Sequence, residues 1–316
     1  MKKTLTDDLH AKIVAMGFNG LLNIGPTTLD NRDFLVWLMD RFNPENMTLD
    51  TRGGKVLPIT EYAIKCVLEL PSTGGDPPHV SKGDENARSE LLALLYPEGN
   101  VSKLGPSKIR DLIVDDRNNN LGKIDDDLYL RLFFMVANCC FLTPNTDSYI
   151  RIVDVKWCDN LDAISHFNWC KIVSDNLRDS GRKWRASRLQ NKPRPSILGC
   201  SLFLIVSCCF PIRKSLYPFH KDFNVHLYIS FFFLHIFYLD NLQIPNGLDP
   251  FETPRCKLFT NEIIKDMQKS DVRRDGSSTS RYGAAKVCLR RSPYPFFLIY
   301  VPHVLQLMYF VRCNSF

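Results

Sequence analysis

The sequence predicts a mainly α-helical globular domain with one small β-hairpin near residues 47–59. Apolar residues recur at three- and four-residue spacing in several separate stretches, which is the periodicity of helices with one buried face. Two short extended stretches flank a pair of glycines, as in a hairpin. A chain of 316 residues that is 45% hydrophobic and 23% charged can bury a core, and its length fits one large domain or two small ones.

The first strong helical pattern begins at Asp30 or Asn31 and ends near Phe42. A capping side chain precedes apolar residues that share one helical face. The hairpin follows, with extended stretches on both sides of Arg52-Gly53-Gly54 within residues 47–59. The glycines supply the positive φ that a tight turn requires.

Thr60 is the expected N-cap of the next, short helix. Residues 72–83 combine Gly, Pro and polar side chains, which is the composition of a loop. We expect one helix around residues 85–96 and another near residues 107–114. A polar turn at residues 115–122 follows it.

The clearest helix starts at Asp125-Asp126-Asp127 and extends to Pro144. Its acidic start suits the positive end of the helix dipole, and its nearly continuous apolar surface predicts a place at the centre of the core. A short extended stretch at residues 148–155 comes next. Apolar residues at helical spacing then predict a helix over residues 160–185, which ends in a basic segment.

Eleven cysteines and a net charge of +6 give weak functional signals. The N-terminal residues lack the apolar core of a signal peptide, so we expect reduced thiols that pack as small hydrophobes. No Cys-x-x-Cys pair occurs, which leaves zinc-ribbon and thiol redox chemistry without the required spacing. The positive charge permits an acidic partner without requiring one.

No motif predicts a catalytic, cofactor or metal site. Arg52-Gly53-Gly54-Lys55 is followed by valine and does not match a phosphate-binding loop, so a hairpin turn is the better interpretation. Asp125-Asp126-Asp127 fits helix capping better than a cation site, which needs ligands from several places. His166 and Cys170 are four residues apart on a helix, without a third group to orient them as a nucleophile pair.

A basic segment is the one stretch that indicates a function. It is a candidate nucleic-acid or nuclear-import patch because its cations can neutralise phosphates and its tryptophan can stack on bases. A solvated helix end, whose cations complement the helix dipole, is the alternative. The residues of this patch are Arg178, Arg182, Lys183, Trp184, Arg185, Arg188, Lys192 and Arg194.

Six segments together resemble the plant mobile domain, a transposon-associated family that is often called "aminotransferase-like" and includes maintenance-of-meristems-like proteins. They occur in the family's order, at residues 16–22, 34–60, 128–150, 167–184, 199–205 and 236–243. The resemblance implies a helical domain with nuclear roles such as transposon silencing or meristem maintenance. Pyridoxal phosphate is not expected, since no segment offers a Schiff-base lysine with a phosphate cradle and an acidic partner.

The sequence departs from the family pattern at residues 206–235, which separate GCSLFLI from IFYLDNL. These thirty residues are rich in Phe, Ser, Cys and Leu, and we interpret them as a translated intron or insertion. The expected organisation is a family-like domain at 1–205, this insertion, a continuation with a basic polar segment at 236–291, and a read-through apolar tail at 292–316.

The expected function is that of a non-enzymatic, transposon-derived nuclear module that associates with nucleic acid or with chromatin-associated proteins. No small-molecule substrate is indicated. An enzyme with an unrecognised dispersed site and a degenerate mobile-element relic are the alternatives. The apolar runs are shorter than the roughly twenty residues of a transmembrane helix, so membrane association is the less favoured location.

Overall fold

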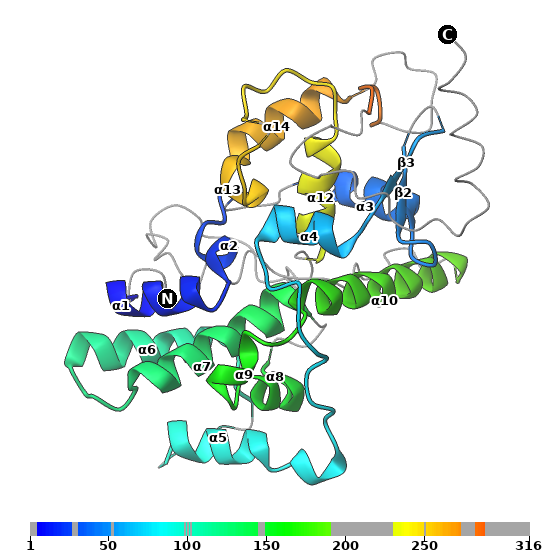
Figure 1. Cartoon of the computed structure of the whole chain (residues 1–316). Helices are drawn as coiled ribbons and strands as arrows, with labels where there is room; N and C mark the ends of the chain where they lie inside the picture. Colours follow the sequence, from blue (N-terminus) through cyan, green and yellow to red (C-terminus); the bar gives the residue numbers. More distant parts are fainter. Residues whose placement is uncertain are drawn as a thin grey trace, which may run out of the picture.

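The computed structural model describes residues 5–26, 31–51, 54–97, 99, 101, 103–144, 149–190, 230–249, 251–272 and 282–287. The prediction of a mainly α-helical fold with a small hairpin is confirmed (Figure 1). The elements of the first half are α1 (Asp7–Ala15), α2 (Asn19–Leu22), α3 (Arg32–Arg41), β1 (Phe42–Asn43), β2 (Thr48–Asp50), β3 (Val56–Pro58), α4 (Glu61–Leu68), η2 (Lys82–Asp84), α5 (Ala87–Leu95) and α6 (Pro106–Asn119). Those of the second half are α7 (Asp126–Ala137), the π-helical turn η3 (Asn138–Leu142), α8 (Ile152–Trp157), α9 (Leu161–Ile164), α10 (Trp169–Leu189), α12 (Ser230–Asp240), α13 (Arg255–Leu258) and α14 (Asn261–Ser270).

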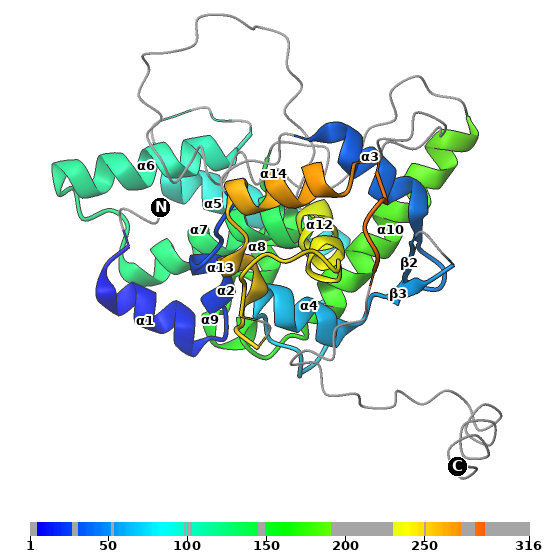
Figure 2. The ribbon, with the colours of Figure 1, turned by 90° about the horizontal axis from the view of Figure 1, so that it is seen from above.

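The long helix α10 lies between two groups of elements (Figure 1). On one side α3, α4 and α12 contact α10, with α13 and α14 beyond them and the small sheet near the C-terminal end of α10. On the other side α6, α7, α8, α9 and α5 pack together, and the view from above separates α6 and α5 from the sheet (Figure 2). One continuous apolar core runs through both groups.

Local capping explains where three of the predicted helices begin. The Asn31 side chain accepts the backbone N–H of Phe34 at the start of α3 at 3.0 Å. Thr60 accepts that of Ala63 at 3.1 Å and begins α4. At the start of α7, Asp125 accepts an N–H bond of 2.7 Å from the backbone, as expected for a capping carboxylate.

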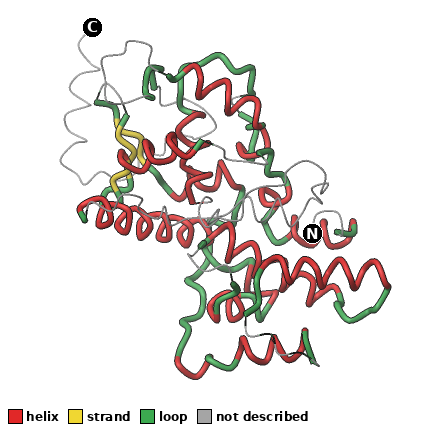
Figure 3. The backbone as a smooth tube through the Cα atoms, turned by 180° about the vertical axis from the view of Figure 1, so that it is seen from behind, coloured by secondary structure: helices red, strands yellow, loops and turns green. Residues whose placement is uncertain are grey.

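The hairpin pairs β2 with β3 in antiparallel register, with Leu49 opposite Leu57. Both leucines are buried, because alternate residues of each strand face the core. Strand β1 adds a third strand that the sequence did not reveal, and it pairs Phe42 with Leu49 directly after α3 (Figure 3).

Three predicted element boundaries are wrong. The stretch 148–155 becomes helical at Ile152, because the Asp154 carboxylate accepts the backbone N–H of Arg151 and caps α8. The helix expected over 160–185 is two helices, α9 and α10. Between them the backbone of Phe167 pairs with Gly75, and Asn168 caps α10. The helix expected near residues 107–114 is α6, which continues to Asn119, so the turn expected at 115–122 begins only after that residue.

The chain beyond residue 230 completes the core. Buried residues of α12, α13 and α14 belong to the same apolar cluster as those of the first 190 residues. Tyr282 closes this region, because its hydroxyl group bonds Asn31 and its ring contacts Phe34 edge-on at 4.9 Å. Of the two segments expected to be foreign, only residues 230–235 lie within the described residues.

Candidate nucleic-acid interface on α10

The described residues of the predicted basic patch, 178–188, lie in the C-terminal part of α10, beside α3 and the sheet (Figure 2). Arg182 forms a two-bond ion pair with Glu45, with Nε–Oε1 and Nη2–Oε2 distances of 3.0 and 2.8 Å. Arg188 pairs with Asp40 in the same way, at 3.0 Å from Nε and 2.7 Å from Nη2. These two arginines therefore join α10 to α3 and to the loop after β1.

The remaining described cations of the patch differ in their partners. Arg178 pairs with Asp175 one turn earlier on α10, at 2.7 Å. Arg185 donates from Nη2 to the backbone carbonyl of Phe42 at 3.0 Å. Lys183 is exposed and forms no ion pair with any described residue. Lys192 and Arg194, the last two residues of the predicted patch, lie outside the described residues.

Trp184 does not serve as a stacking platform, so that expectation is wrong. The indole is 3% exposed, and its Nε1 donates to Asp40 at 2.9 Å. Trp184 lies seven residues after Leu177 on the buried face of α10, and this spacing was the signal that could have placed it in the core. The patch is therefore a row of cations without an available aromatic ring.

Close packing fixes the position of the patch. A Cβ atom at Gly181 would lie 2.5 Å from the Phe42 ring, so only glycine allows α10 to approach the end of α3 this closely. The acidic partners Asp40 and Glu45 come from sequence positions more than 130 residues away. Sequence spacing along α10 gave no signal for either of them.

Carboxylates offset much of the positive charge of the patch. The hydrogen bond from Arg182 lowers the pKa of Glu45, and the same bond raises the pKa of Arg182. Even so, the side chains of Arg182 and Arg188 are each 50% exposed. Their guanidinium groups are thus held in place by carboxylates while they still face solvent.

The other residues considered for chemistry have structural partners. Cys170 is buried, its thiol contacts the Leu70 carbonyl oxygen, and burial raises its pKa to about 12. His166 is exposed, and its ring bonds the carbonyl of Asp162 at 2.6 Å, so it does not face Cys170 as a base. Within the described residues, no group of three or more His, Cys, Asp or Glu side chains could hold a metal ion.

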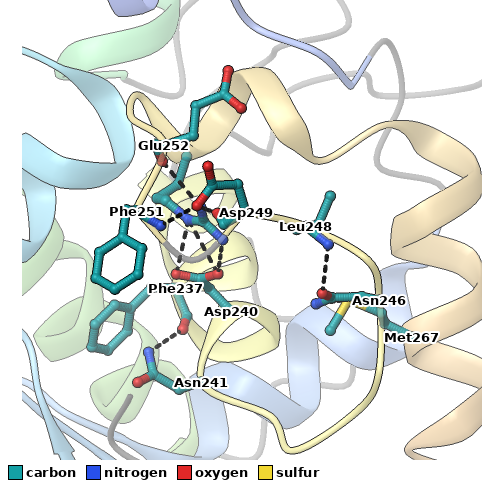
Figure 4. Close-up of polar contacts among 10 residues, drawn as sticks. Phe237, Asp240, Asn241, Asn246, Leu248, Asp249, Phe251, Glu252 and Met267 are labelled. Atoms are coloured by element: carbon teal, nitrogen blue, oxygen red, sulfur yellow. Dashed lines mark hydrogen bonds and ion pairs between the residues drawn. The ribbon is translucent and has the colours of Figure 1, made fainter. Parts of the chain in front are cut away.

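A buried ion pair beyond residue 205 was missed by sequence reasoning. The Arg255 guanidinium bonds the Asp240 carboxylate, with an Nη2–Oδ1 distance of 2.6 Å, and both side chains are buried. Arg255 also donates to the backbone carbonyls of Asp249 and Glu252 (Figure 4). Because protein atoms surround this guanidinium, the pair is a structural contact at the end of α12 and not a binding site.

A family model described as "Domain of unknown function (DUF8566)" matches residues 1–205 of the chain. The chain belongs to this family. No curated protein and no solved structure matches it. The DUF8566 match ends before α12, whereas the core continues through α14.

None of the described helices is long and apolar enough to cross a membrane. The resemblance to the plant mobile domain stays a prediction.

Proposed function

We propose that this DUF8566 chain is a non-enzymatic module that associates with nucleic acid through the exposed cations of α10. One observation carries the proposal: the side chains of Arg182 and Arg188 are each 50% exposed, on the same helix as Lys183, which is exposed and forms no ion pair with a described residue. Guanidinium groups that are already extended and oriented lose little freedom when they bind phosphate.

The ion pairs of the patch do not prevent phosphate from binding. An exposed pair between a cation and a carboxylate contributes only about 0–1 kcal/mol, because water and salt screen it. Phosphate oxygens can therefore share or replace Asp40 and Glu45 as partners of Arg188 and Arg182. Since Trp184 is buried, the contacts would be made to the nucleic-acid backbone, and we expect little preference for base sequence.

The resemblance of the sequence to the plant mobile domain adds a cellular context to this proposal. It supports a proposed location in the nucleus and a proposed role, as a transposon-derived protein, in transposon silencing or meristem maintenance. A chromatin-associated protein with an acidic surface would recognise the same cations and is the alternative partner. If the chain is instead an enzyme with a dispersed site or a relic without activity, changes to the cations of α10 should leave any affinity for nucleic acid unchanged.

A charge reversal at Lys183 tests the proposal, because this side chain forms no ion pair with a described residue. The variant Lys183→Glu should weaken binding to a DNA duplex and reduce the salt dependence of log K by about one phosphate contact. Lys123→Glu is the matched control, since Lys123 is exposed on the turn between α6 and α7, away from α10 (Figure 1).

Both variants change the net charge equally, so a general electrostatic effect would lower their affinities for the duplex equally. Binding is measured by fluorescence anisotropy with a labelled duplex at several salt concentrations, and thermal melting verifies that both variants fold. Equal loss of affinity in the two variants, or no loss in either, would contradict the proposed interface.

A further inference from the structure

The middle of α12 contains a residue that does not suit its surroundings. His235 is 1% exposed and its ring lies 4.6 Å from that of Phe34. Its Nε2 atom contacts the amide of Gln268 at 2.6 Å, but its buried Nδ1 atom has no hydrogen-bond partner among the described residues. A buried polar atom without a partner is unfavourable, because it has lost its bonds to water. An apolar side chain here would remove this atom, although it would also remove the contact with Gln268.

The two residues that precede His235 are well packed. Phe233 and Leu234 are buried, and the Phe233 ring stacks on that of Phe237 one turn later at 5.5 Å. The core of the domain therefore requires Phe and Leu at these two positions of α12. The residue after them should be apolar.

A second segment of the chain carries this pattern. Phe203-Leu204-Ile205 has the same Phe-Leu pair, followed by isoleucine in place of histidine. The DUF8566 match ends at residue 205, immediately after this segment. If residues 206–235 are removed, Ile205 directly precedes Ile236, and the three residues take the helical positions of Phe233, Leu234 and His235.

We infer that the site on α3 and α14 occupied by residues 233–235 of α12 is built for Phe203-Leu204-Ile205, and that the core is complete without residues 206–235. In the shortened chain, Phe203 stacks on Phe237 and Leu204 replaces its identical counterpart. Ile205 replaces the histidine and removes the unpaired nitrogen. The register is specific, because a shift by one residue turns a helix by about 100° and moves every side chain off the core.

Two deletions test the inference through its register. The variant that lacks 206–235 should melt at or above the temperature of the full chain. The variant that lacks 206–234 keeps His235 and displaces the preceding residues by one position, so it should melt several degrees lower. A lower melting temperature for the first deletion than for the full chain, its failure to fold, or equal melting of the two deletions would overturn the inference.

A substitution shows which phenylalanine occupies the site. Phe203→Ala should lower the Tm of the chain without 206–235 by roughly 6–20 °C, as for loss of a buried ring, and by more than it lowers the Tm of the full chain, where Phe233 occupies the site. Phe233→Ala should destabilise the full chain to a similar extent. A Phe203→Ala variant that melts like its parent in the shortened chain would show that Phe203 does not enter the site.

Discussion

Removal of the buried guanidinium of Arg255 should strongly destabilise the fold. Arg255 and Asp240 are both buried, and Arg255 also bonds two backbone carbonyls. Arg255→Ala leaves the Asp240 carboxylate buried without its cation, a change that typically costs about 3–5 kcal/mol. For a domain of this size, we expect the Tm to fall by roughly 6–20 °C.

Lys257→Ala is the matched control, because Lys257 lies on the same short helix and pairs with Glu252 at the surface. Its side chain is 52% exposed, so we expect a loss below about 1 kcal/mol. Urea unfolding followed by circular dichroism measures both variants. If Arg255→Ala were as mild as Lys257→Ala, α12 and α13 would not be part of the same cooperative fold as residues 1–205.

Three further predictions concern α10 and α12. Trp184→Ala should destabilise by about 3–5 kcal/mol, whereas Leu189→Ala, at a side chain that is 85% exposed, should have almost no effect in the same urea titration. Gly181→Ala should lower stability by about 1–3 kcal/mol, because its Cβ overlaps the Phe42 ring; a neutral result in thermal melting would contradict this packing. Burial lowers the pKa of His235 to about 3, below that of the unfolded chain. The unfolded state therefore binds the extra proton, and stability should fall by up to about 1.4 kcal/mol per unit as the pH drops from 6.5 towards 3, a dependence that His235→Gln removes.

Local signals predicted the helices whose starts are fixed by nearby side chains. Asn31, Thr60 and Asp125 each cap the helix that the sequence placed after them. The break between α9 and α10 was missed although Asn168 caps α10, because the chain there also depends on backbone pairing between Phe167 and Gly75. Contacts between distant segments determine that boundary. The hydrophobic periodicity of a single stretch carries no information about such contacts.

The sequence predicted the cations of α10 but not the carboxylates that pair with them. The row of cations on α10 was evident, whereas the carboxylates of Asp40 and Glu45 reach it only through the packing of α3 and the loop after β1. Trp184 follows the spacing of the apolar residues on α10, and its side chain is therefore buried with them in the core. Its burial changes the expected mode of recognition from base stacking to phosphate contact.

The salt dependence of binding to a DNA duplex tests the central claim most directly. If Arg182, Lys183 and Arg188 each neutralise one phosphate, log K should fall linearly with log salt concentration with a slope of roughly −2.7. Duplexes of unrelated sequence should give the same slope, since only the backbone is contacted. A slope near zero, or no measurable binding at low salt, would contradict the assignment of α10 as a nucleic-acid interface.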